Sequence, residues 1–156
     1  MKLLSIQLTF FLLLFSLSFS TSYADNGLVT KASAYNVTET TDRLVAIIKK
    51  KGITLFARIN HAQGAKDAGL TLLPTELVIF GKPQLGNPIM ILDPRLAIDL
   101  PLKALIWEDK EGKVWLSYNS PVYIAQRHSI PEQHPIIKKM TGALDKLSDY
   151  ATKATP

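Results

Sequence analysis

The sequence predicts an α+β domain in which an antiparallel sheet of about five strands carries two long amphipathic helices on one face. Short segments of alternating apolar and polar residues recur along the chain, which is typical of half-buried strands. Brief connections containing Gly and Pro join most of these segments and favour antiparallel pairing. Only two stretches place apolar residues at helical spacing over several turns. The predicted order is therefore strand, helix, four strands, helix, with small helical insertions between the middle strands.

The N-terminus has the features of a secretory signal peptide. Lys2 supplies a positive charge, and the apolar stretch Leu3–Phe19 follows it. Ser22 and Ala24 then occupy the positions at which a signal peptidase requires small side chains. We expect cleavage after residue 24, so that residues 25–156 form a single exported domain, periplasmic or extracellular in a bacterium. The alternative is a membrane anchor that remains uncut, because a spanning helix needs about 20 apolar residues.

The first strand and helix follow this segment. Residues 28–35 alternate in polarity and predict a strand. The next stretch predicts a helix that Asn36 or Thr38 caps and that ends at Gly52, with lysines in its last turn. Its apolar positions are spaced i, i+3, i+4 on one face: Leu44, Ile47 and Ile48.

The middle of the chain predicts two further strands with short helical segments. Residues 53–60 predict a strand, and residues 61–68 predict a helical turn closed by a glycine. The apolar segment Thr75–Phe80 predicts a buried strand covered on both faces. Residues 85–92 are compatible with a short helix, provided that Pro88 lies in its first turn.

The last third of the chain predicts a hairpin and a long helix. Segments 102–107 and 113–118 are strands joined by a five-residue loop with a glycine near its end, a pattern of hairpins that contain a bulge. Pro135 is suited to the first position of a helix. The buried stripe of that helix is expected to contain Ile137, Met140, Leu144 and Leu147.

Several short motifs, in this order along the chain, resemble a family known as domain of unknown function 302. They are Thr41-x-Arg43-Leu44, Ile59-Asn60-His61, Ala65-x-x-Ala68-Gly69-Leu70, Pro74-Thr75-Glu76-Leu77, Phe80-Gly81-Lys82-Pro83, Asp99-Leu100-Pro101-Leu102-Lys103, Trp107-Glu108-Asp109, Gly112-Lys113-Val114-Trp115 and Tyr118-Asn119. The resemblance implies a fold similar to that of TATA-binding-protein-like domains, often paired as a homodimer, and implies no activity. Lys82 departs from the family pattern, which more often resembles Asn at this position.

Composition excludes several classes of function. The net charge of +5 is spread along the chain, apart from the short clusters Lys49–Lys51 and Lys138–Lys139. A nucleic-acid-binding surface would show a concentrated basic stripe, so we expect no nucleic-acid partner. The chain has no cysteine, which rules out disulfides and thiolate metal ligands. We expect neither a metal nor a cofactor, and no stable membrane insertion once the signal is removed.

The candidate site residues fall into two groups. The aromatic side chains of Trp107, Trp115 and Tyr118 lie on the predicted hairpin and suit an interface or a ligand groove. His61, Glu108 and Lys82 follow strand ends. The paired carboxylates Glu108 and Asp109 are interpreted as turn residues, because adjacent strand residues point to opposite faces.

These observations favour a non-enzymatic exported domain that binds a small molecule or assembles with itself, as a homodimer. The alternative is a small hydrolase or metal-dependent enzyme that uses His61 with a carboxylate such as Glu108. The two hypotheses differ in one geometric requirement, because the enzyme needs His61 and the carboxylate to converge in a cleft.

Overall fold

Five strands form one antiparallel sheet in the order β1-β5-β4-β3-β2. The structure is a computed structural model that describes residues 26–154. The predicted signal segment and its cleavage position lie outside these described residues. The strands are β1 (Leu28–Ala32), β2 (Thr54–Asn60), β3 (Thr75–Gly81), β4 (Leu102–Glu108) and β5 (Val114–Asn119). The predicted fold class is confirmed.

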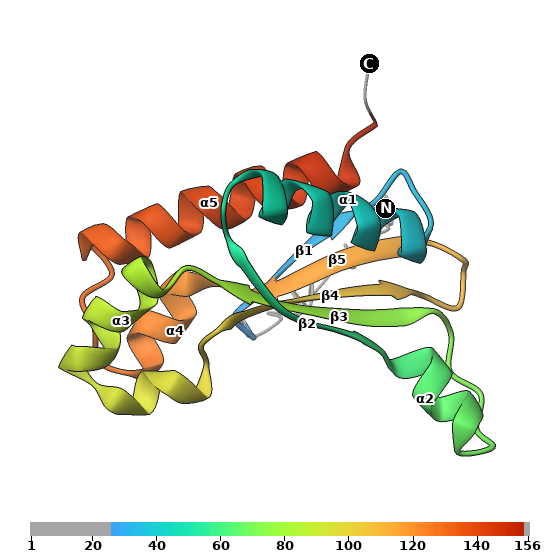
Figure 1. Cartoon of the computed structure of the whole chain (residues 1–156), viewed down its shortest axis with the longest axis horizontal. Coiled ribbons are helices and arrows are strands. Elements are labelled where there is room, and N and C mark those ends of the chain that lie inside the picture. Colours follow the sequence, from blue (N-terminus) through green and yellow to red (C-terminus); the bar gives the residue numbers. More distant parts are fainter. Residues whose placement is uncertain (1–25, 155–156) are drawn as a thin grey trace, which may run out of the picture.

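Two long helices, α1 (Val37–Lys50) and α5 (Pro135–Thr152), lie side by side on one face of the sheet (Figure 1). The Asn36 side chain caps α1 by accepting a hydrogen bond of 2.8 Å from the Glu39 N–H. Gly52 follows the helix with a φ of +62°, and the Ile53 N–H returns to the carbonyl of Ile48. These contacts form the Schellman C-cap that a glycine permits.

The main core lies between these helices and the sheet. The largest fully buried side chains come from both layers and include Leu44, Ile48, Val78, Phe80, Ile106 and Leu116. Among the described residues, no helix lies across the opposite face of the sheet (Figure 1). The expectation that both faces of Thr75–Phe80 are covered was therefore wrong, because Val78 and Phe80 are buried whereas Leu77 and Ile79 remain partly exposed.

Shorter helices gather at the two ends of the sheet (Figure 1). Helix α2 (His61–Asp67) follows β2 at one end. At the other end lie α3 (Pro83–Leu92), the 3-10 helix η1 (Pro94–Ile98) and α4 (Pro121–Arg127), which enclose a second apolar cluster with the start of α5.

Two boundaries and one helix differ notably from the sequence predictions. Strand β1 ends at Ala32, because the following residues turn toward the cap of α1. Helix α3 begins at Pro83, so Pro88 lies inside it and not in its first turn. Helix α4 was not predicted, although Ser120 caps it and Pro121 occupies its first turn. Within residues 26–154, no helix combines the length and the apolar character that crossing a membrane would require.

Candidate functional site

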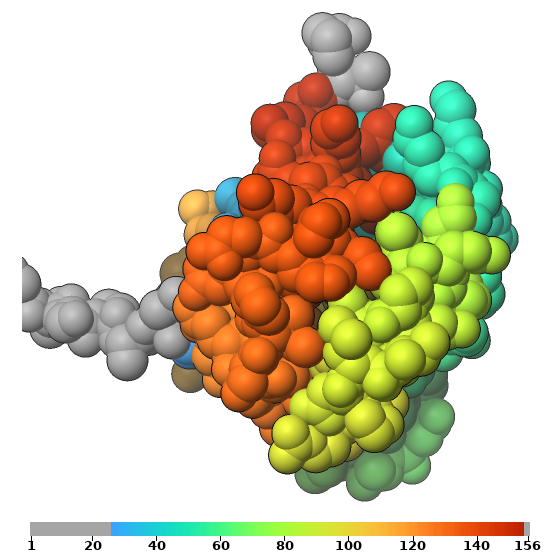
Figure 2. Space-filling model, turned by 90° about the vertical axis from the view of Figure 1, so that its left-hand side faces the viewer, coloured from blue at the N-terminus to red at the C-terminus, as the bar shows by residue number. Residues whose placement is uncertain are grey.

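The strongest candidate site is an apolar pocket at the end of the sheet where β2 begins and β3 ends. Helices α3 and α5 form its sides, and Figure 2 shows the surface hollowed along the boundary between α3 (yellow-green) and α5 (orange). Its volume is about 280 Å³. Its apolar lining includes Phe56, Phe80, Leu85, Met90, Leu102, Met140 and Leu147. Apolar walls with few polar groups are typical of small-molecule sites.

A break in the sheet register positions one wall of this pocket. Leu55 pairs with Phe80 and Ala57 pairs with Ile79, which leaves Phe56 as an extra residue in β2. Such bulges bend a strand and redirect a side chain. The ring of Phe56 lies in the pocket wall with 53% of the residue exposed to solvent. No local sequence signal marks a bulge of this kind, so sequence reasoning did not identify this residue.

Two lysines also line the pocket, and Lys82 is one of the candidates identified from the sequence. Lys82 is the N-cap residue of α3 and makes no side-chain capping hydrogen bond. Lys51 is the C-cap residue of α1. Both lysines are exposed residues, so the charged part of the pocket wall borders solvent.

The uncovered face of the sheet is a second candidate site. Trp107 and Trp115 are direct cross-strand partners on this face, with ring centroids 6.3 Å apart and planes inclined by 25°. The indole N–H of Trp107 donates to Ser117 Oγ at 3.0 Å, and that of Trp115 donates to Asp109 Oδ2 at 2.6 Å. The two indoles are therefore held in place before any partner binds.

Tyr118 does not belong to this aromatic surface. It is three residues from Trp115, so it points to the opposite face of β5, where it is buried in the main core. The sequence left this question open, because the strand register decides which side chains share a face.

The turn next to the tryptophans is built around Asp109. Its carboxylate accepts the Trp115 indole N–H and the backbone N–H groups of Lys113 and Glu111. The hydrogen bond from Trp115, assisted by those backbone groups, lowers the pKa of Asp109 from its ordinary value. Asp109 is thus a turn residue, as the sequence suggested.

His61 and Glu108 do not converge. His61 is exposed at the start of α2 after β2, whereas Glu108 ends β4, and β3 lies between these strands. Two strand spacings amount to about 10 Å, which is beyond hydrogen-bond reach. Within the described part of the chain no hydrogen bond or ion pair involves the His61 side chain. The geometric requirement of the enzymatic alternative is not met by this pair.

A buried polar cluster that sequence reasoning missed connects η1 to α4. His128 Nε2 lies 2.6 Å from Asp99 Oδ2, and its Nδ1 lies 3.7 Å from Asp93 Oδ2. Arg127 donates to Asp99, and Arg95 donates to Asp93 and lowers the pKa of that carboxyl. His128 is 29 residues from Asp99 and further still from Asp93, so no spacing in the sequence reveals these partners.

This cluster joins η1 to α4 through paired charges. Asp93 and Asp99 each lie next to an arginine as well as the His128 imidazole, and buried charges require such partners. Among residues 26–154, no group of three or more His, Cys, Asp or Glu side chains is arranged to hold a metal ion.

The sequence of this chain is similar to those of two proteins from Brucella species. The chain is 46% identical over 131 residues to two proteins named fluoride-specific ion channels, FluC 1 of Brucella suis biovar 1 (strain 1330) and FluC 2 of Brucella melitensis biotype 1 (strain ATCC 23456 / CCUG 17765 / NCTC 10094 / 16M). The matched region covers 83% of this chain but only 52% and 48% of those proteins. The chain therefore spans about half the length of the curated relatives it matches.

A solved structure has the same fold. The crystal structure of an uncharacterized conserved DUF302 protein from Bacillus stearothermophilus aligns with a TM-score of 0.72 at 16% identity, covering 81% of this chain and 98% of that one. The family model described as domain of unknown function DUF302 matches residues 29–147, which contain all of the sheet except the first residue of β1, the pocket and most of α5. The chain belongs to the DUF302 family.

Proposed function

We propose that this protein is an exported, non-enzymatic module that binds a small apolar molecule in the pocket between α3 and α5. The observation that carries the proposal is the pocket itself, an apolar cavity of about 280 Å³ open to solvent at one side. It has almost twice the volume of an apolar cavity of about 150 Å³ that accepts benzene. Binding there would remove apolar surface of both partners from water, which is the main source of affinity in such sites.

A neutral fluorescent probe tests this function. N-phenyl-1-naphthylamine carries no charge and brightens when it leaves water, so titration of the purified protein measures occupancy of the pocket. Ala143→Trp should abolish binding, because Ala143 lines the pocket and the indole would fill it. Thr141→Trp is the matched control, since Thr141 is an exposed residue of the same helix that does not line the pocket. Equal binding by both variants, or none by the wild type, would contradict the proposal.

Export is part of the proposal and rests on the N-terminal segment. The apolar stretch followed by Ser22 and Ala24 supports secretion with cleavage before Asp25. N-terminal sequencing of protein recovered from the exported fraction should begin at Asp25. Protein that begins at Met1 and sediments with membranes would instead identify an uncut anchor.

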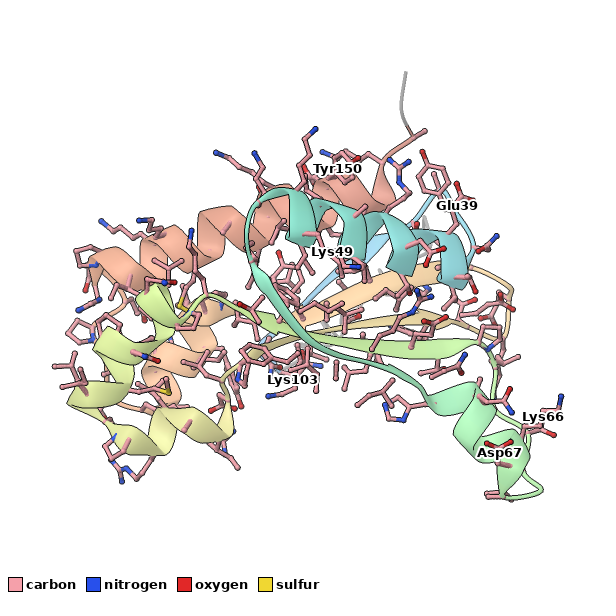
Figure 3. All side chains as sticks on the ribbon, viewed as in Figure 1. Glu39, Lys49, Lys66, Asp67, Lys103 and Tyr150 are labelled. Carbon is pink, nitrogen blue, oxygen red and sulfur yellow. The ribbon has the colours of Figure 1, made fainter. Side chains whose placement is uncertain are left out.

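The same proposal includes a homodimer formed through the uncovered face of the sheet. Among the strand residues on this face, Lys103 is the only charged one, and Figure 3 shows it on the side away from α1 and α5. Its ammonium group donates to the backbone carbonyls of Asp99 and Pro101. The apolar side chains on this face, among them Leu77, Ile79, Leu105, Trp107 and Trp115, support an interaction site there. The proposed partner is a second copy of this chain. Because the face carries little charge, two copies of it related by a two-fold axis repel each other only weakly.

Sedimentation equilibrium tests the dimer. Trp107→Ala or Trp115→Ala should weaken association by about thirtyfold, the usual effect of truncating a central interface aromatic. His61→Ala should leave association unchanged, because His61 lies beyond the sheet on α2. Tyr118→Ala should lower stability instead, since Tyr118 is in the core. Dimerisation that survives both tryptophan changes would refute this interface.

The Brucella relatives favour a second candidate function. Their names describe fluoride-specific ion channels, and this chain corresponds to about half of each. A role as the accessory domain of such a channel is testable in the relative itself. Deleting the matched half should then lower fluoride resistance of cells that depend on the channel, and unchanged resistance would eliminate this candidate.

A further inference from the structure

The charges at the pocket between α3 and α5 are all of one sign. Of the residues that the structure describes, Lys51 and Lys82 are the only charged ones in its lining, and both are exposed. Within residues 26–154, neither lysine has a carboxylate within the 4.0 Å of an ion pair, unlike Lys31 and Lys153. An apolar cavity bordered by two cations without partners offers a complementary site to a negatively charged group.

The start of α3 adds to the same positive field. This helix of ten residues begins at Pro83, directly after Lys82, and its first turn forms part of the pocket wall. The N-terminal end of a helix carries a partial positive charge that favours anions. Within residues 26–154 the ammonium group of Lys82 makes no hydrogen bond and no ion pair, so it is available to a ligand.

Lys51 has a second interaction that must be separated from ligand binding. It ends α1, where cations offset the negative end of the helix dipole. Lys49 and Lys50 lie in the last turn of the same helix but do not line the pocket. They provide matched controls, because their removal changes the dipole interaction and the net charge without changing the pocket.

We infer that the pocket takes an amphiphile with an apolar tail and a single anionic head, such as a medium-chain carboxylate. The tail would lie against Phe56, Met90 and Met140, and the head would lie at the rim between Lys51 and Lys82. This inference rests on the proposed function and names the ligand class of that site. The head remains partly hydrated, so it contributes selectivity for charge while the tail contributes most of the affinity.

Displacement of N-phenyl-1-naphthylamine by decanoate, decanol and decylamine tests the ligand class on the purified protein. Decanoate should bind about tenfold more tightly than decanol at low salt, because two exposed cations and the start of a helix favour its anionic head. Decylamine should bind more weakly than decanol. The preference for decanoate should fall as salt is raised, because exposed charges are screened.

Matched variants separate this inference from the proposed function. Lys51→Gln with Lys82→Gln should remove most of the preference for decanoate, apart from the share due to the start of α3, and should leave decanol binding unchanged. Lys49→Gln with Lys50→Gln should preserve the tenfold preference. Equal binding of decanoate and decanol by the wild type, or a preference that is undiminished by loss of Lys51 and Lys82, would overturn the anionic ligand but leave an apolar site. Failure of the neutral probe to bind would overturn the pocket function as well.

Discussion

Arg58 connects two carboxylates that differ greatly in exposure, and its replacement should separate their contributions to stability. Its Nε donates to Glu76 Oε2, and its Nη1 donates to Asp42 Oδ1, each at 2.5 Å. The side chain of Glu76 is 5% exposed and that of Asp42 is 60% exposed, with Arg58 at 33%. One arginine therefore serves a buried charge on β3 and a solvated charge on α1.

Arg58→Met should destabilise the protein by about 3 kcal/mol. Removing one partner of a buried ion pair costs about 3–5 kcal/mol, because the remaining charge is desolvated without compensation. We expect the lower end of that range, since water already reaches Arg58 and can approach Glu76 when the guanidinium is gone. Methionine retains the apolar stem, so packing changes little. With a urea slope of about 1–3 kcal/mol per M, the unfolding midpoint should fall by about 1–3 M.

Asp42→Asn is the matched control, because it breaks the exposed half of the same network. Exposed ion pairs contribute about 0–1 kcal/mol, so its midpoint should remain close to that of the wild type. Arg58→Met combined with Glu76→Gln should recover part of the loss, since no charge is then left buried. If Arg58→Met and Asp42→Asn lowered the midpoint equally, Glu76 would not behave as a desolvated charge and the reasoning would be refuted.

Three further predictions concern backbone geometry, packing and pH. Gly52→Ala should lower the free energy of unfolding by about 1 kcal/mol, because Gly52 has a φ of +62°. Ser129→Gly should raise it by about 0.5 kcal/mol, because Ser129 occupies the same region with a φ of +55°. Denaturant midpoints measure both changes, and equal effects would contradict the conformational explanation. Phe80→Ala should cost about 3–5 kcal/mol, since Phe80 is buried in the core, and a loss below about 1 kcal/mol would contradict this packing. The lowered pKa of Asp109 stabilises the folded state above the unfolded pKa of about 3.9 and loses that effect as pH falls through the folded pKa. Carboxyl NMR titration should show a higher pKa for Asp109 in Trp115→Phe, which lacks the indole donor, and an unchanged pKa would exclude that donor as the cause.

Local chemistry was sufficient to predict the elements that hold this fold together. Asn36 and Gly52 delimit α1, because a side-chain acceptor and a left-handed C-cap are interactions within a few residues of the chain. The apolar stripe of α5 predicted the residues that this helix buries, Leu144 and Leu147 in the main core and Ile137 and Met140 in the second apolar cluster. The signal Ser120-Pro121 at the start of α4 was also present in the sequence and was overlooked.

The candidate sites depended on contacts between distant parts of the chain. The register of β4 against β5 decided that Trp107 and Trp115 share the uncovered face while Tyr118 lies in the core. An extra residue in β2 decided that Phe56 faces the pocket. Side-chain direction in a sheet reverses with a shift of one residue, so no reading of one strand alone can settle it.

By itself, the sequence determined the α+β class and the order of the strands and the two long helices, because periodicity and caps are local properties. Its motifs also suggested the family. Only the tertiary structure decided which charged and polar side chains lie next to each other. It separated His61 from Glu108, paired His128 with Asp99, and brought Lys51 and Lys82 to one apolar pocket. Convergence of this kind follows from sheet order and helix packing, which join residues that the chain keeps far apart.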